Sequence, residues 1–195
     1  MSLKFAILTS LTERAGSGIE LARRFDKSIG YFWPATHQQI YRELDRLVGD
    51  ALIRQLPQTG PPRRGQPRSF EVTDEGRRLL QEWIGADDHP EAMRSTMAVR
   101  LRAAAATGAI REARDALQHH RQQREENLER YREIEQRDFA DVAPDDSRAV
   151  LQHRVLTLGI EVEQAWVDWC DQTFEELNRL TTPAHAHLEG PRSGP

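Results

Sequence analysis

The stretch from Trp33 to Trp83 constrains the fold more than any other part of the chain. It begins with a segment whose apolar residues recur every three or four positions, which is typical of a helix with one buried face. Two short alternating runs follow, 52–56 and 69–72, and they are separated by the Pro-, Arg- and Gly-rich segment 57–68. A second helical pattern closes the stretch. A helix, a hairpin with a long tip and another helix, in that order, predict a winged helix.

The first helix of this stretch is predicted to begin near Thr36, because Thr36 and Gln39 have the spacing of a capping box. Its inner stripe is expected to contain Ile40, Leu44, Leu47 and Val48. On the outer face, Gln can pair with adenine and Arg with guanine in the major groove of DNA. Asp45 faces outward one turn further on, where it would repel phosphate, so the expected groove surface ends at Arg42. The predicted DNA contacts on this helix are Thr36, His37, Gln38, Gln39, Tyr41 and Arg42.

The segment 57–68 is predicted to form the tip of a two-stranded hairpin, which would be the wing. Its prolines oppose regular strand pairing, and no acidic residue lies between Asp50 and Glu71. Cationic side chains suit the negative potential of a narrow minor groove. The alternative is a solvated loop whose arginines only keep the protein soluble. The predicted wing contacts are Arg63, Arg64, Gln66 and Arg68.

Two shorter helices are predicted before Trp33. The first has an inner stripe of Leu3, Ile7, Leu8 and Leu11. Ser17 and Glu20 have the spacing of a second capping box, which opens the next helix. In a winged helix this second helix crosses the DNA backbone, so Ser17 is a candidate phosphate contact at a helix N-terminus. A simple N-cap is the alternative interpretation.

Beyond residue 90 the chain becomes long, charged and helical. Helices are predicted over 91–106, 110–138 and 147–180. The last has the longest periodic stripe in the chain, formed by Leu151, Val155, Leu158, Val162, Ala165, Trp166, Trp169, Thr173, Phe174, Leu177 and Leu180. Two helices of one chain cannot readily cover so much apolar surface. A second copy of the chain is therefore the expected partner, in a two-fold symmetric dimer.

These patterns predict a mainly α protein in three parts. Residues 1–85 would form a winged helix-turn-helix of three helices plus a β-hairpin wing, and residues 86–180 a C-terminal antiparallel helical dimerisation domain. Residues 181–195 are predicted to be a disordered tail. Residues 1–85 contain 13 Lys and Arg against 10 Asp and Glu, whereas the rest contains 14 against 21. The positive part is the part with the DNA-binding pattern.

Several strings carry a family resemblance. SGIELARRF (17–25), QQIYRELDRL (38–47) and FEVTDEGRRLLQEW (70–83) resemble the N-terminal domain of PadR-type transcriptional regulators, in matching order and spacing. YREI (131–134) and LTLGIEVEQAWVDW (156–169) resemble the helical C-terminal region of the larger PadR-like branch. The resemblance implies a homodimeric repressor, less often an activator, that binds a palindromic operator as double-stranded DNA and leaves it when a small molecule binds.

Two positions depart from the family pattern. Ile19 stands where an aromatic residue is usual, which removes a phosphate contact from the second helix. Ala51 stands where a glycine is usual. Because alanine disfavours the left-handed conformation that glycine tolerates, we expect the turn to be made at Gly49 or Asp50 instead.

Clustered aromatic residues in the last helix suggest where a small-molecule effector would bind. Trp166 and Trp169 share a face, and Phe174 lies nearby. Such rings can stack on a flat phenolic or drug-like molecule between subunits. Burial in the dimer core is the alternative interpretation.

Other functions lack support in the sequence. We find no Gly-rich phosphate loop, nucleophile elbow or metal-ligand spacing, so we expect no enzyme, no cofactor and no metal site. The single cysteine, Cys170, excludes an internal disulfide, and no apolar run approaches the roughly 18 residues of a membrane span. A cytoplasmic protein is expected. The remaining alternative function is a winged-helix protein-interaction module without sequence-specific DNA binding.

Overall fold

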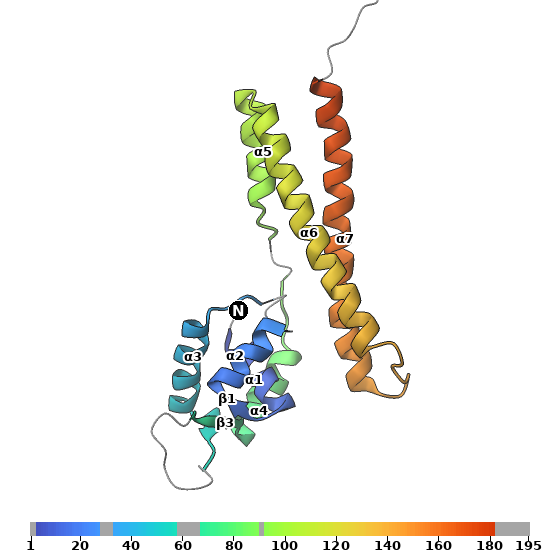
Figure 1. Ribbon diagram of the computed structural model, residues 1–195. Coiled ribbons are helices and arrows are strands. Elements are labelled where there is room, and N and C mark those ends of the chain that lie inside the picture. The colour runs from blue at the N-terminus through green and yellow to red at the C-terminus, as the bar shows by residue number, and fades with distance from the viewer. Residues whose placement is uncertain (1–2, 28–32, 58–66, 90–91, 182–195) are drawn as a thin grey trace, which may run out of the picture. The chain divides into compact units, whose positions relative to one another are not determined.

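The fold is mainly helical, with one small antiparallel sheet in its N-terminal part, as the sequence predicts (Figure 1). The computed structural model describes residues 3–27, 33–57, 67–89 and 92–181. The chain divides into two compact units, residues 1–91 and 92–195. The helix α7 ends at Thr181, so the predicted tail beyond it lies outside the described residues.

The first unit has the order of elements that the sequence predicts, plus one additional strand. Its helices are α1 (Leu3–Glu13), α2 (Gly18–Lys27), α3 (His37–Gly49) and α4 (Asp74–Ile84), and its strands are β1 (Gly16–Ser17), β2 (Ile53–Gln55) and β3 (Ser69–Val72). The hairpin of β2 and β3 is confirmed, with Ile53 opposite Val72. The strand β1 pairs antiparallel with the other edge of β3, so the sheet order is β1-β3-β2. The strand β1 could not be predicted from the sequence, because two residues are too few to show an alternating pattern.

A single apolar core holds this unit together, and it draws on every helix and on the sheet. Its buried members are Ile7, Leu8, Leu11, Leu21, Ala22, Phe25, Ile40, Leu44, Leu47, Leu52, Ile53, Phe70, Val72 and Leu80. The predicted stripe of α3 is correct except at Val48, which is 39% exposed. Val48 directly follows the buried Leu47, and adjacent helical side chains point about 100° apart. The core therefore fixes which face of α3 is turned outward.

The end of α3 corrects the expectation for Ala51. Ala51 has φ +56°, in the left-handed region, so the turn is made there and not at Gly49 or Asp50. The N–H of Ala51 donates to the carbonyl of Val48 at 3.1 Å, and the N–H of Leu52 donates to that of Leu47 at 3.0 Å. This is the Schellman pattern, which requires a left-handed residue at this position whatever its side chain.

Ala51→Gly should therefore stabilise the protein. An alanine in the left-handed conformation is strained by about 1–2 kcal/mol. Glycine removes this strain but loses roughly 0.5–1 kcal/mol more backbone entropy on folding. We expect a small net gain, measured as a higher urea midpoint with an unchanged slope. An equal or lower midpoint would show that Ala51 is not strained in solution.

The second unit consists of three helices, and two of them form a long antiparallel pair. These are α5 (Thr96–Thr107), α6 (Ile110–Asp138) and α7 (Ser147–Thr181), with α6 and α7 side by side (Figure 1). The predictions for α6 and α7 are correct within one residue. The helix α5 begins later than predicted because Ser95 is its N-cap, accepting from the N–H of Ala98 at 3.1 Å.

The stripe of α7 proves to be two faces rather than one. Val167, Cys170 and Leu177 are buried within the unit, together with Glu163. In contrast, several members of the predicted stripe are 45% to 72% exposed within a single chain, namely Leu151, Val155, Leu158, Val162 and Leu180. Of these buried residues the predicted stripe includes Leu177 but not Val167 or Cys170, so the prediction followed the exposed face more closely than the buried one. The exposed set alone is called the outer α7 stripe below.

Candidate nucleic-acid interface

The start of α3 is held by the predicted capping box. The hydroxyl of Thr36 accepts from the N–H of Gln39 at 3.2 Å, and the N–H of Thr36 donates to the Gln39 side-chain oxygen at 2.8 Å. This reciprocal pair satisfies backbone donors that the first turn would leave unpaired. The side-chain oxygen of Gln39 is therefore engaged at the helix end, and a contact with a base would have to replace that bond.

Gln38 and Arg42 form the outward edge of α3. Both side chains are exposed and lie four residues apart, which places them one above the other on the helix. Within the described part of the chain, neither makes an ion pair or a side-chain hydrogen bond. His37 differs, because its Nε2 lies 3.3 Å from a carboxylate oxygen of Asp26 on α2. The first turns of α3 thus present an amide and a guanidinium to solvent.

Tyr41 lies against the start of α2. It is 41% exposed, and its ring is so close to Gly18 that a Cβ there would be 2.4 Å from a ring carbon. Only glycine allows this approach. A hollow of about 140 Å³ lies between α2, α3 and the base of the wing, and it is lined by Gly18, Ile19, Tyr41, Leu44, Pro67, Arg68 and Phe70.

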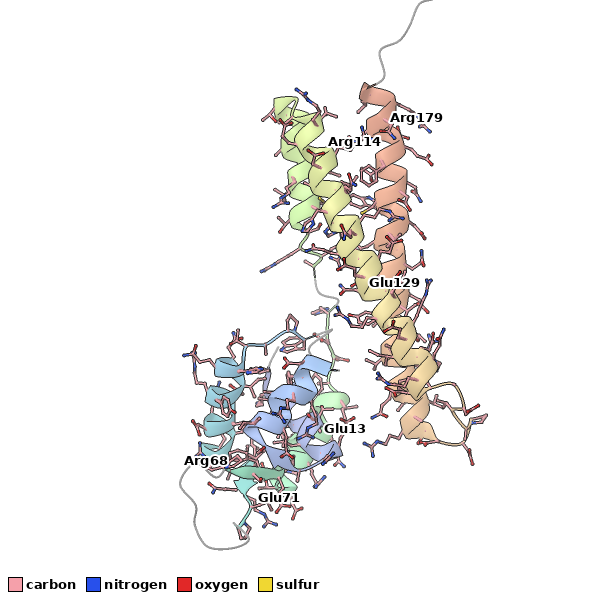
Figure 2. The ribbon with its side chains drawn as sticks, in the orientation of Figure 1. Glu13, Arg68, Glu71, Arg114, Glu129 and Arg179 are labelled. Carbon is pink, nitrogen blue, oxygen red and sulfur yellow. The ribbon has the colours of Figure 1, made fainter. Side chains whose placement is uncertain are left out.

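The base of the wing is tied to α3 by an ion pair. Arg68, which is labelled in Figure 2, donates through Nη2 to Asp45 at 2.9 Å. Its guanidinium carbon lies 5.7 Å from the ring centroid of Phe70. Asp45, which sequence analysis identified as an obstacle to phosphate, therefore has a cationic partner. The other predicted wing contacts, Arg63, Arg64 and Gln66, lie outside the described residues.

Ser17 occupies the capping position rather than an open phosphate site. It is 4% exposed, and both its hydroxyl and its N–H donate to one Glu20 carboxylate oxygen, at 2.9 and 2.7 Å. These hydrogen bonds from Ser17 are the main reason that the pKa of Glu20 lies below its usual value. A phosphate contact by Ser17 would require this arrangement to open.

The aromatic residues proposed for an effector lie inside the second unit. The rings of Trp166 and Trp169 meet edge to face, with centroids 5.4 Å apart. Trp169 and Phe174 pack against the cluster formed by Met97, Leu117, Cys170 and Leu177. Arg124 lies 5.0 Å from the Trp166 ring centroid and pairs with the buried Glu163 at 3.1 Å. The Arg124–Glu163 pair could not be found from the sequence, because the two residues lie on different helices.

Two family models divide the chain between them. Residues 7–82 match the PadR-like family of transcriptional regulators, and residues 93–178 match the C-terminal domain of virulence activator alpha. A probable transcriptional regulator of Mycobacterium tuberculosis is 39% identical in an alignment of 189 residues, gaps included. The alignment covers 91% of this chain and 98% of that protein. The chain belongs to the PadR-like family of transcriptional regulators.

Solved structures of related proteins have the same fold. The virulence activator AphA of Vibrio cholerae is 29% identical to this PadR-like chain, with a TM-score of 0.76. The alignment covers 92% of this chain and 100% of the AphA chain. PadR of Bacillus subtilis in complex with operator DNA is 25% identical with a TM-score of 0.72, and the alignment covers 90% of this chain and 98% of that one. The Bacillus protein in complex with p-coumaric acid aligns over the same shares at 23% identity, with a TM-score of 0.73.

The described residues of this PadR-like chain hold no group of three or more His, Cys, Asp or Glu that is arranged to bind a metal ion. No helix among them is long and apolar enough to cross a membrane. Cys170 is fully buried, and burial is the main reason that the pKa of its thiol is raised. A raised pKa disfavours the reactive thiolate.

Proposed function

We propose that this PadR-like regulator is a homodimeric, sequence-specific DNA-binding repressor that a small molecule releases from an inverted-repeat operator. The observation that carries the proposal is the exposed pair Gln38 and Arg42, one turn apart on the outer face of α3. The operator complex of the related Bacillus protein supports the same use of this fold.

In this proposal the residues of the interface divide into two roles. Gln38 and Arg42 read base edges, since an amide fits adenine and a guanidinium fits guanine. Tyr41 and the wing contribute phosphate or minor-groove contacts that hold α3 in register. Thr36 and Gln39 fix the start of the helix, and His37 lies at the edge of the contact surface. Arg63, Arg64 and Gln66 remain predicted wing contacts.

Arg42→Ala should weaken operator binding and relax the preference at one base pair. A good side-chain pair with a base discriminates by about 1–3 kcal/mol, so we expect a loss of roughly 5- to 150-fold at the preferred base. The measurement is fluorescence anisotropy with the operator selected by the wild-type protein from DNA upstream of its own gene, and with single-base variants of that operator. Arg64→Ala should instead lower affinity for most sequences alike.

A matched control for Arg42→Ala is Arg77→Ala, which removes one exposed arginine from α4. It should leave the base preference unchanged. If Arg42→Ala behaves like this control, α3 does not read bases in the proposed way. Affinity that is independent of salt would favour the protein-interaction module, because phosphate contacts release counterions on binding.

The outer α7 stripe supports the homodimer. Leu151, Val155, Leu158 and Val162 are spaced by four, three and four residues, which aligns them along one side of α7. A stripe of this kind on a single chain marks a protein contact. A second copy provides the same stripe, so a two-fold axis beside α7 buries both copies at once. Two reading heads would then bind half-sites about one helical turn apart, or a multiple of it.

The effector is expected to bind at the aromatic residues of α7. Trp166 is half-buried and its ring contacts those of His120 and Trp169, so it is the side chain that should report an effector. Trp169 and Phe174, which pack against the buried cluster of the second unit, are the other two predicted contacts. The Bacillus relative in complex with p-coumaric acid supports a phenolic ligand as the first probe. Release of the labelled operator by such a ligand, together with a change in tryptophan fluorescence, is the direct test.

A further inference from the structure

A second hollow lies beside α2, and arginine dominates its lining. Its volume is about 180 Å³, and it is lined by Arg14, Ala15, Glu20, Arg23 and Arg24. Arg24 is the fixed member, because its Nη1 donates to the carbonyl oxygens of Ser10 at 2.8 Å and of Arg14 at 2.6 Å. The charge of Arg24 therefore also offsets the partial negative charge of the carbonyl groups at the C-terminal end of α1.

The hollow has more positive charge than its own residues neutralise. Glu20 is its one acidic lining residue, and that carboxylate accepts both hydrogen bonds from Ser17. Arg14 and Arg23 are exposed and make no ion pair with any residue that the structure describes. Burial is the main reason that the pKa of Arg24 is lowered, followed by repulsion from the charge of Arg14, while the carboxylates of Glu20 and Glu13 act in the opposite direction. A bound anion would relieve this repulsion.

The position of the hollow connects it to the proposed DNA surface. Arg23 follows Ile19 by one turn of α2. Ile19 lines the other hollow, the one between α2, α3 and the base of the wing, together with Tyr41 and Arg68. Arg14 lies just before β1, which pairs with the wing strand β3. The arginine hollow is thus anchored to the same sheet and the same helix that flank α3 and the wing.

We propose that Arg14, Arg23 and Arg24 form a phosphate site that binds a DNA-backbone phosphate outside the base pairs read by α3. The guanidinium group favours phosphate because its forked donors match two phosphate oxygens. Arg24 holds the end of α1 in place, while Arg14 and Arg23 supply the mobile donors. This inference rests on the proposed function, and it adds a contact that lengthens the footprint of each half-site.

The test uses the full-length protein and two duplexes. The short duplex ends with the inverted repeat, and the long duplex extends it by several base pairs on each side. The double variant Arg14→Gln/Arg23→Gln leaves Arg24 and its carbonyl contacts intact. Wild type should bind the long duplex more tightly than the short one, and the variant should bind both alike, losing about tenfold on the long duplex only. The slope of log affinity against log salt should fall by about 0.9 for each phosphate that the variant no longer neutralises.

The control is Arg77→Gln/Arg111→Gln, which removes two exposed arginines elsewhere. It should retain the preference for the long duplex. If the Arg14→Gln/Arg23→Gln variant also retains it, the phosphate site is wrong, although base discrimination on the short duplex would leave the proposed function standing. If wild type shows no base discrimination on either duplex, the proposed function itself fails.

A free oxyanion is the other source of the same chemistry. Inorganic phosphate, compared with chloride at equal ionic strength, should raise the melting temperature of wild type no more than that of the double variant if the site is made for DNA. A phosphate-dependent rise in wild type alone, together with equal binding of both duplexes, would overturn the assignment to the DNA backbone.

Discussion

In the proposed homodimer, Leu158→Glu is expected to separate the two copies and to lower the affinity for an inverted-repeat operator by about 10²–10⁴, the factor typical of linking two binding events. Leu158 is 61% exposed in a single chain and lies at the middle of the outer α7 stripe. A carboxylate placed there would be desolvated against its symmetry-related copy, which is costly because like charges would meet in an apolar contact. Glutamate is a good helix former, so α7 itself should persist.

The measurement for Leu158→Glu is light scattering after size-exclusion chromatography, followed by operator titration. Gln172→Glu is the matched control, because it places the same new charge at an exposed polar position of the same helix. The control should remain a dimer with full operator affinity. A Leu158→Glu protein that still forms dimers at micromolar concentration would show that the two copies meet on another surface.

Caps and stripes explain why so much of this fold could be predicted from sequence. The capping boxes predicted at Ser17 and Thr36 are local patterns, and both are present. Each depends on residues within one helical turn, so the sequence alone contains the relevant information.

Contacts between distant segments could not be predicted in this way. Asp45 looked unfavourable for DNA binding because its partner, Arg68, is contributed by another element. Glu163 and Arg124 meet only because α6 and α7 fold back on each other. Periodicity gives the face of a helix but not the side chain opposite it.

Ala51 shows a different limit. Its residue type argued against a left-handed turn, yet the hydrogen bonds that close α3 require one there. The cost of one strained residue is about 1–2 kcal/mol, and a helix end packed through Leu47 and Leu52 can tolerate it. Preference at one residue therefore yielded to packing around it, which is the usual outcome when the two conflict.

Gly76→Ala is expected to be strongly destabilising, although alanine is normally the better helix residue by about 1 kcal/mol. A Cβ on Gly76 would lie 2.2 Å from the carbonyl oxygen of Leu52 and 2.8 Å from a methyl carbon of Val72. That carbonyl accepts from both the N–H and the hydroxyl of Thr73, at 3.1 and 3.0 Å. Moving it away would disrupt the N-cap of α4 and the end of β3 together.

The expected loss of stability for Gly76→Ala is about 3 kcal/mol or more, since overpacking typically costs about 1–3 kcal/mol and hydrogen bonds are broken as well. That is a large fraction of a total stability of roughly 5–15 kcal/mol. Urea unfolding followed by circular dichroism measures it. Gly49→Ala provides the contrast, because apart from its chain neighbours and the adjoining backbone of α3 nothing lies within 4 Å of its Cβ position, and the same substitution there should be neutral or stabilising. Equal effects at the two glycines would mean that α4 does not approach the Leu52 carbonyl this closely. The packing of α4 against Leu52 and Val72 would then have to be revised.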